Sequence, residues 1–269
     1  MATLVTEQGN VHYEVYGRGR PVVLLHGWLN SWAVWRSTVE LLGREFRLYA
    51  LDFLGFGESG THTQSFSVNN YVFMVNEFME RMVIKKAPLI GHSMGGTVAL
   101  SAAIHYPEKV VKVAVVGSPI QGTSLSPLLR LAGYRGWIGL AETTPVLYNV
   151  FQKGFLQFLR VYAYFMAKDG KAVGKMLTAD VSRLTAQPFF ESIGTLKQTD
   201  LRPRVGELKM PVLGIYGKKD IIVDPKQSKV LKECLPGSTI AWFEHSGHFP
   251  MMDETERFHT TVRDFLYNA

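Results

Sequence analysis

The sequence has almost no cysteine. Cys234 is the single cysteine among 269 residues, so the chain cannot form an internal disulfide. Residues 1–15 contain neither the basic start nor the apolar run of a secretory signal. Because disulfides are rare in reducing compartments, these two features together predict a cytoplasmic protein.

Long apolar runs are missing as well. A helix needs roughly 18 uncharged apolar residues to cross a bilayer, and the best candidate, residues 155–167, is interrupted by Arg160. We therefore expect no integral association with a membrane. Hydrophobic residues still make up 46% of the chain, which is enough for one large core, and the length suits one domain with an insertion.

Patterns that bind metals or phosphates are scarce. His245 and His248 lie three residues apart, but no other ligand spacing and no H-E-x-x-H helix accompanies them, so we expect no metal. The glycine-rich run Asp52–Ser59 lacks the Lys-Ser/Thr ending of a phosphate loop. We interpret it as a structural turn in which Asp52 hydrogen-bonds nearby backbone, and we expect no cofactor. Four further histidines are interpreted as ordinary surface or helix-end residues: His12, His62, His105 and His259.

Acidic residues are few in one part of the chain. The net charge is +6, and residues 118–203 contain ten basic and five acidic residues, so +5 of that charge lies in one segment. No Lys/Arg cluster or binding motif accompanies it, so a solvated outer face explains the charge better than a nucleic-acid site. We expect that the protein binds no nucleic acid. We also expect it to be a monomer or homodimer. A weak attraction to acidic substrates or membrane surfaces stays open.

Short β-rich runs alternate with helical runs along most of the chain. Strands are predicted over residues 11–16, 21–26, 46–52, 87–91, 110–117, 212–217 and 239–243, and helices over 35–44, 68–84, 95–105, 225–234 and 255–267. Residues 21–25 are continuously apolar, which implies burial on both faces. The predicted fold class is α/β, with a mostly parallel, doubly wound sheet. In such sheets ligands bind at the carboxyl ends of strands, where the following residues fall: His26, Asp52, Ser93, Ser118 and Asp220.

The alternation stops after the fifth predicted strand, where helical segments follow one another with no strand between them. We therefore predict a core domain made of residues 1–118 and 204–269, with residues 119–203 inserted as a helical cap. Within residues 146–168, aromatic side chains recur at three- and four-residue steps opposite a polar stripe, which is typical of an amphipathic helix. Its apolar face should pack inside the insertion and also present apolar surface to a substrate.

The segment Gly91-His92-Ser93-Met94-Gly95-Gly96 matches a G-x-S-x-G signature between a predicted strand and a predicted helix. Such a strand-turn-helix bends sharply at the serine, with glycines on both sides because a Cβ there would collide with neighbouring elements. Ser93 is therefore the candidate nucleophile. A serine hydroxyl also needs a base, an orienting acid and an oxyanion site.

The candidate base is His248, in the loop between the last predicted strand and the last predicted helix. Asp220 follows a buried strand and precedes His248 by 28 residues, which gives the chain order Ser, Asp, His of this architecture. Asp224 is the rival acid. Pro225 after it suits a first helical position, so Asp224 resembles a helix N-cap. We favour Asp220 on the turn chemistry.

Two backbone N–H groups should form the oxyanion hole. One comes from Met94, which follows the nucleophile, and the other from the loop His26-Gly27-Trp28. Trp28 is the preferred second donor, and Leu29 is the alternative. The substrate pocket is expected to include His26, Leu29, Trp32, His92 and Phe249.

Together these segments resemble the α/β-hydrolase superfamily over essentially the whole chain. The shared segments are His26-Gly27-Trp28, Asp52-x-x-Gly55-x-Gly57-x-Ser59, Gly91-His92-Ser93-Met94-Gly95-Gly96, Asp220 and Gly247-His248. The resemblance implies an eight-stranded sheet under a helical cap. It also implies that Ser93 is the nucleophile, that His248 is the general base and acid, and that Asp220 orients His248.

Two families are similar to this chain in different segments. The loop from His26 to Trp35 is similar to that of the pimeloyl-ester hydrolases of biotin synthesis, although these carry Gly-Trp before the serine. Gly-His-Ser-Met-Gly-Gly is similar to monoacylglycerol lipases, whose oxyanion loop differs. Haloalkane dehalogenases and epoxide hydrolases carry aspartate where this chain has Ser93, so an alkyl-enzyme route is disfavoured.

We therefore expect a serine carboxylic-ester hydrolase that cleaves short- to medium-chain, small-molecule esters through an acyl-enzyme on Ser93. Trp28, Trp32 and the aromatic cap favour an apolar acyl or alcohol part. Lactonase, thioesterase, monoacylglycerol lipase and perhydrolase activities use the same triad and stay open. A ligand receptor on the hydrolase scaffold is disfavoured by the complete triad.

Overall fold

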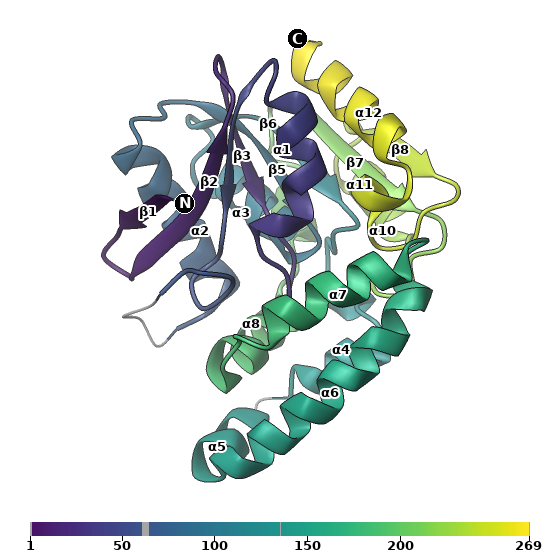
Figure 1. The fold of residues 1–269 in the computed structure, drawn as a ribbon. Coiled ribbons are helices and arrows are strands. Elements are labelled where there is room, and N and C mark those ends of the chain that lie inside the picture. Colours follow the sequence, from purple (N-terminus) through teal and green to yellow (C-terminus); the bar gives the residue numbers. More distant parts are fainter. Residues whose placement is uncertain (1, 61–64, 135, 269) are drawn as a thin grey trace.

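The computed structural model describes residues 2–60, 65–134 and 136–268, and its centre is one eight-stranded sheet (Figure 1). The strands are β1 (Ala2–Val5), β2 (Asn10–Tyr16), β3 (Pro21–Leu25), β4 (Arg47–Leu51), β5 (Ala87–His92), β6 (Val110–Val116), β7 (Val212–Gly217) and β8 (Thr239–Phe243). Their spatial order is β1-β2-β4-β3-β5-β6-β7-β8. β2 pairs antiparallel with β1 and β4, and all other neighbours are parallel. The predicted fold class is confirmed.

The middle of the sheet is buried on both faces. β3 pairs with β4 on one side and β5 on the other, and residues 22–25 have no exposed surface. This burial explains the continuously apolar sequence of β3. All seven strands predicted from the residue pattern are present. The pattern does not predict the eighth, β1, because its four residues alternate between partly buried and exposed at the sheet edge.

Helices cover both faces of the sheet (Figure 1). On one face, α1 (Arg36–Leu42) follows the short helix η1 (Trp32–Trp35) and packs against α11 (Pro250–Asp253) and α12 (Thr255–Tyr267). On the other, α3 (Met94–His105) packs against α2 (Val68–Arg81) and α9 (Arg202–Val205), which contacts α10 (Gln227–Cys234). α10 begins two residues later than predicted, because the Asp224 carboxylate accepts a hydrogen bond from the Lys226 N–H and forms a turn first.

Between β6 and β7 the described residues form helices and no strand. They are η2 (Gly122–Ser124), α4 (Pro127–Ala132), α5 (Gly136–Thr143), α6 (Pro145–Met166), α7 (Gly170–Val181), α8 (Ala186–Gln198) and α9. In Figure 1, α4 to α8 gather below the sheet, and α6 lies along α7. An isolated bridge between Gln121 and Asp200 joins the two ends of this segment. No helix in the described part of the chain is long and apolar enough to span a membrane.

Two histidines differ from the expectation that they are surface or helix-end residues. His12 is 2% exposed and its Nδ1 lies 2.7 Å from Asp52 Oδ2. His259 is also buried, and its Nε2 hydrogen-bonds the Thr38 hydroxyl at 3.1 Å. Sequence periodicity does not find these pairs, because each joins residues far apart in the chain. His105 does end α3, and His62 lies outside the described residues.

Candidate active site

Ser93 stands between the end of β5 and the start of α3. Its backbone has φ 51° and ψ −119°, a left-handed conformation that is costly for a residue with a Cβ. The bend depends on two neighbouring glycines. A Cβ at Gly91 would collide with the Gly95 carbonyl, and a Cβ at Gly95 would collide with the Leu25 carbonyl. The sequence signature therefore produces the sharp turn that was predicted, with the Ser93 side chain at its apex.

His248 and Asp220 form a buried hydrogen-bonded pair. His248 Nδ1 lies 2.7 Å from Asp220 Oδ2, and both residues are less than one-tenth exposed. Asp220 Oδ1 accepts hydrogen bonds from the Ile222 and Val223 amides at 2.8 and 3.0 Å, so the carboxylate is held from both ends. The pairing requires the proton on Nδ1, which leaves His248 Nε2 as an acceptor.

Asp224, the rival acid, lies elsewhere. It is exposed, and its Oδ1 accepts a hydrogen bond from the Lys226 amide at 2.9 Å. The structure thus brings Asp220 to His248 and leaves Asp224 at the surface. Asp224 stabilises a local turn beside Pro225.

The loop after β3 lies directly over the candidate nucleophile. A Cβ at Gly27 would be only 3.0 Å from Ser93 Cβ and 2.9 Å from His92 Nδ1. Leu29 has φ 63°, and the Asn30 side-chain amide donates to the Trp28 carbonyl at 2.9 Å, so the turn is rigidly shaped. Among the described residues, the amides of Trp28 and Met94 donate to no other group. Two backbone donors are therefore free beside the serine.

His26 holds this loop rather than facing a substrate. Its Nε2 accepts a hydrogen bond from the Phe53 amide at 2.9 Å, so its Nδ1 carries the proton and donates to the Gly27 carbonyl at 2.7 Å. The Gly27 carbonyl belongs to the same peptide unit as the Trp28 N–H. Because the two groups point in opposite directions, His26 fixes the orientation of that N–H. Burial lowers the pKa of His26 and keeps it neutral.

A cavity of about 600 Å³ opens beside Ser93 and His248. Leu29 and Phe249 line it, as expected, and Trp28 lines it as well. Most of its wall comes from the helices between β6 and β7. Four of these lining residues belong to the aromatic repeat for which the sequence predicted apolar surface facing a substrate: Phe151, Phe155, Phe158 and Tyr162. The sequence did not identify the others, which include Leu128, Trp137, Tyr148, Met166 and Phe189. The aromatic periodicity of residues 146–168 was the available signal, because one face of α6 supplies many of these side chains.

His26, Trp32 and His92 are not among the described residues that line this cavity. The His92 ring packs 4.7 Å from the His248 ring, and its Nε2 donates to the His248 carbonyl at 2.9 Å, so it supports the loop that carries the base. Burial lowers the pKa of His92 well below its ordinary value. The Trp32 ring instead packs in a tilted arrangement 6.4 Å from the Tyr16 ring, and the Arg36 guanidinium lies 5.5 Å over it.

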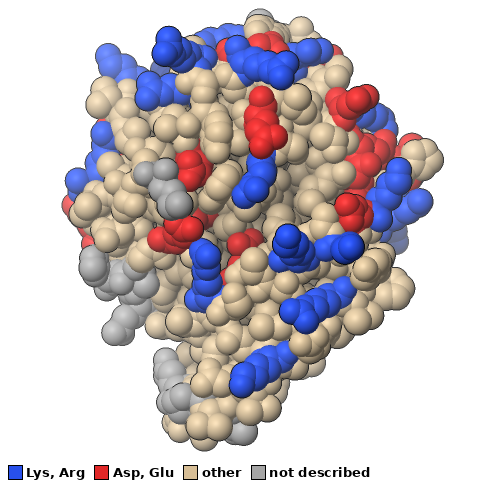
Figure 2. Space-filling model, in the orientation of Figure 1, with Lys and Arg blue, Asp and Glu red and all other residues tan. Residues whose placement is uncertain are grey.

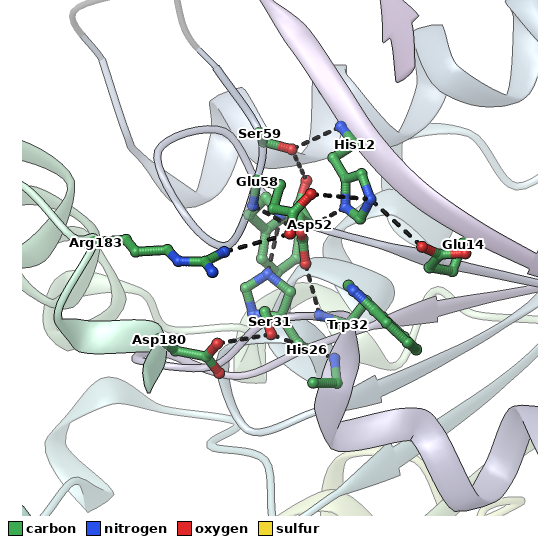
Figure 3. A network of polar contacts seen from close by, with 12 residues as sticks. His12, Glu14, His26, Ser31, Trp32, Asp52, Glu58, Ser59, Asp180 and Arg183 are labelled. Carbon is green, nitrogen blue, oxygen red and sulfur yellow. Dashed lines mark hydrogen bonds and ion pairs between the residues drawn. The ribbon is translucent and has the colours of Figure 1, made fainter. Parts of the chain in front are cut away.

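Asp52 anchors a polar network behind the loop (Figure 3). It has no exposed surface, and its carboxylate accepts hydrogen bonds from the Trp32 amide at 2.6 Å and the Glu58 amide at 3.0 Å. The prediction that Asp52 binds nearby backbone is confirmed. His12 is an additional partner, and its pKa is raised, chiefly by the hydrogen bond to Asp52. The run Asp52–Ser59 is thus a structural turn.

The helices between β6 and β7 are tied to this region by three polar contacts. The Ser31 hydroxyl donates to Asp180 Oδ1 at 2.9 Å, and the Trp28 indole donates to the Phe189 carbonyl at 3.0 Å. Arg183 and Glu58 form an exposed ion pair at 3.3 Å (Figure 3). Asp180 Oδ2 is buried without a partner in the described residues. Burial therefore raises the pKa of Asp180 to about 7.

Replacing Asp180 with asparagine should remove a pH dependence of stability. Because the folded-state pKa of Asp180 is about 7 and the unfolded value is about 4, the folded chain holds the extra proton between these pH values. The free energy of unfolding therefore falls as pH rises from about 4 to about 7. Asp180→Asn keeps an acceptor for Ser31 without the charge, so it should be more stable than wild type at pH 8, by roughly 1–3 kcal/mol.

Urea unfolding at pH 5 and pH 8 measures this effect. The control is Asp224→Asn, an exposed carboxylate whose removal should leave the pH dependence unchanged. Equal slopes for wild type and Asp180→Asn would mean that Asp180 is ionised in the folded protein throughout this range.

Comparison with known proteins agrees with this architecture. A family model described as the α/β-hydrolase fold matches residues 20–255. The pimeloyl-[acyl-carrier protein] methyl ester esterase of Vibrio campbellii is 32% identical over 264 residues, which are 95% of this chain and 98% of that protein. The protein of the same name from Vibrio parahaemolyticus is 31% identical over 263 residues, with the same coverage of each chain.

Solved structures show the same fold at lower identity. An esterase, EaEST, from Exiguobacterium antarcticum matches with a TM-score of 0.80 at 21% identity, covering 97% of this chain and 96% of that one. An enol-lactonase from Burkholderia xenovorans matches with a TM-score of 0.80 at 20% identity, covering 99% of this chain and 100% of that one. Because the family model spans most of the chain and relatives above 30% identity cover nearly all of it, this protein belongs to the α/β-hydrolase family and is a hydrolase that cleaves ester bonds.

Proposed function

We propose that the protein is a serine carboxylic-ester hydrolase that forms an acyl-enzyme on Ser93. The observation that carries this proposal is the buried pair of His248 and Asp220, of which His248 lines the same cavity as Ser93. A base that is held by a carboxylate and faces the same cavity as a sharply bent serine is the arrangement that acyl transfer requires.

The proposed reaction has two halves. Ser93 Oγ attacks the ester carbonyl while His248 Nε2 takes the hydroxyl proton, and the amides of Met94 and Trp28 stabilise the oxyanion. His248 then gives that proton to the leaving alcohol. Water next attacks the acyl-enzyme in the same way, which releases the acid and restores Ser93. Asp220 keeps the His248 proton on Nδ1 and stabilises the imidazolium that forms in each half.

The lining of the cavity suits a substrate whose acyl or alcohol group is uncharged and apolar. No Lys, Arg, Asp or Glu stands among the described residues that line it. Tyr148 and Met166 of α6 both line the cavity. Because a helix rises 1.5 Å per residue, the cavity follows α6 for about 27 Å between these two residues. Since an extended chain advances about 1.2 Å per bond, a chain of about ten carbons is about 12 Å long and takes up less than half of that length. This supports the medium-chain end of the expected range.

We also propose that residues 119–203 act as a cap over the core domain, residues 1–118 and 204–269. The isolated bridge between Gln121 and Asp200 at the base of the segment supports these boundaries. The cap then supplies most of the substrate-binding wall, and the core supplies the reacting groups. We further propose a cytoplasmic enzyme that acts as a monomer or homodimer, without cofactor, metal or nucleic acid.

A second candidate substrate is a carrier-bound methyl ester. Relatives that are 31–32% identical over nearly the whole chain are named pimeloyl-[acyl-carrier protein] methyl ester esterases. A methyl ester at the end of an aliphatic chain is uncharged, which suits the apolar cavity. The net positive charge of residues 118–203 favours a carrier whose docking surface is acidic.

A substrate panel tests the proposal. It compares kcat/KM for p-nitrophenyl esters of increasing chain length, lactones, acyl thioesters and methyl pimeloyl thioesters of an acyl-carrier protein. We expect sustained multiple turnover on the simple esters, with an optimum at medium chain length. A single turnover would favour a receptor, and a dominant rate on the carrier-bound ester would favour the second candidate.

Filling the cavity from α6 should shorten the preferred chain. Gly154 lines the cavity, and a Cβ added there meets no atom within 4 Å. Gly154→Phe should therefore fold and occupy cavity space, lowering kcat/KM for a decanoyl ester about tenfold relative to a butanoyl ester. Gly139→Phe on α5 is the matched control, since its Cβ also meets nothing and the residue does not line the cavity. Equal chain-length profiles for both variants would place the acyl chain elsewhere.

A further inference from the structure

Exposed apolar side chains are concentrated on the helices between β6 and β7. Of the twenty large hydrophobic residues exposed in the described part of the chain, twelve lie within residues 119–203. A protein surface rarely exposes a contiguous apolar area without a function for it. This region therefore carries more apolar surface than folding of the chain explains.

Four of these twelve residues lie on one side of α6. Side chains at three- and four-residue steps share a face of a helix, and one such set points away from the cavity. We call it the outer face of α6, and its members are Val146, Val150, Lys153, Gln157, Arg160, Val161 and Tyr164. Val146, Val161 and Tyr164 are 74%, 65% and 63% exposed. The opposite side of the helix lines the cavity through residues such as Phe155 and Tyr162.

The outer face of α6 carries positive charge and no acidic residue. Lys153 and Arg160 lie on it. Beyond the end of α6, exposed Lys168 and Asp169 precede α7, and exposed Lys171 and Lys175 lie within α7. At the lower end of the molecule, Figure 2 shows basic groups set in uncharged surface, apart from the grey atoms. Apolar residues interspersed with lysine and arginine are typical of helices that lie at a bilayer surface.

We propose that the outer face of α6 binds the surface of an anionic lipid bilayer. Val146, Val150 and Val161 enter the boundary between headgroups and acyl chains, and Tyr164 lies at that boundary, where tyrosine is favoured. The long side chains of Lys153 and Arg160 extend to the anionic headgroups. The inference goes beyond the proposed hydrolysis and does not depend on it.

The cavity wall reaches the protein surface beside this face. Phe151 and Phe158 are 44% and 40% exposed, and both also line the cavity. They lie on α6 between its outer face and its cavity side. An apolar ester dissolved in a bilayer could pass from the lipid to the cavity along them without crossing water. A lipid surface thus accounts for the exposed apolar residues, for the charge and for the position of the entrance.

A second copy of this chain fits the outer face of α6 less well. In a twofold dimer the same patch meets itself, so Lys153 and Arg160 of one copy would approach those of the other. No acidic side chain on this face would compensate. Lipid phosphates supply the opposite charge over the whole face.

Vesicle co-sedimentation of the full chain tests the proposal. The probes are vesicles of phosphatidylcholine alone and of phosphatidylcholine mixed with phosphatidylglycerol, at low and high salt. Wild type should sediment with the anionic vesicles, and less so at high salt. Lys153→Glu/Arg160→Glu should lower the partition coefficient about tenfold or more, since each basic residue near the surface is worth about fivefold. Val150→Ser/Val161→Ser/Tyr164→Ser should lower it to a similar degree.

Matched controls use exposed residues of the core domain. Lys85→Glu/Lys86→Glu changes the net charge equally, and Val5→Ser/Val15→Ser/Phe73→Ser removes comparable apolar surface. Neither should change vesicle binding more than about twofold. No residue in either outer-face variant lines the cavity, so turnover of a water-soluble ester serves as the check on folding.

Three outcomes would overturn the proposal. The first is no sedimentation of wild type with anionic vesicles at low salt. The second is a loss of binding that is equal in the outer-face variants and their controls. The third is binding of this face to another partner instead of vesicles: light scattering that shows a dimer lost in the outer-face variants would identify a second copy, and binding to an acidic carrier protein would identify that partner.

Discussion

Ser93→Ala should abolish ester hydrolysis, lowering kcat by roughly 10⁴- to 10⁶-fold. The alanine removes the attacking oxygen and leaves His248 and Asp220 in place. Folding should be retained, because the Ser93 side chain makes no capping hydrogen bond to α3 and alanine is smaller. The measurements are kcat on a p-nitrophenyl ester and covalent labelling by a fluorophosphonate, read as intact mass.

Ser118→Ala is the control for this variant. Ser118 is fully buried at the end of β6, its hydroxyl donates to the Val116 carbonyl, and it does not line the cavity. We expect the probe to label Ser118→Ala as it labels wild type, and to leave Ser93→Ala unlabelled. Labelling that survives in Ser93→Ala would place the nucleophile at another residue.

Asp220→Asn should lower kcat by roughly 10⁴-fold. The asparagine carbonyl can still accept the Ile222 and Val223 amides that Asp220 Oδ1 accepts now, so the loop should keep its shape. Its NH₂ group would face His248 Nδ1 and favour the tautomer with the proton on Nε2. In that tautomer the imidazole has no lone pair to offer Ser93, so the general base is lost.

Asp224→Asn separates this effect from a general loss of charge near the site. Asp224 is exposed, and its side chain accepts a hydrogen bond from the local Lys226 amide, so we expect the kcat of Asp224→Asn to stay within about twofold of wild type. A larger loss in Asp224→Asn than in Asp220→Asn would mean that the orienting acid is Asp224. The melting temperature of each variant shows whether a lost rate reflects a lost fold.

Local patterns predicted the elements that position the candidate site. The continuous apolar run of β3 and the Gly-x-Ser-x-Gly turn gave the strand and the bend at Ser93, because both depend on residues close together in the chain. The order of Ser93, Asp220 and His248 also came from the sequence. The sequence favoured Asp220 over Asp224 as the orienting acid but did not decide between them. The structure pairs His248 with Asp220.

Long-range contacts account for what the sequence did not predict. His26, Trp32 and His92 were expected in the pocket because they lie next to the reacting groups in sequence. In the structure their side chains instead bind Phe53, Tyr16 and the His248 carbonyl. His12 was expected at the surface, but it reaches Asp52, which directly follows the neighbouring strand β4.

The sequence by itself determined the sheet, the helical insertion and the identity of the candidate reacting groups, because periodicity, turn glycines and motif spacing are properties of nearby residues. Only the tertiary structure decided which side chains line the cavity and which face of α6 is left outside. Residues with the same pattern, such as the aromatic residues of α6, divide between cavity and surface according to how that helix packs on α7. That packing is a long-range contact, so no local pattern specifies it.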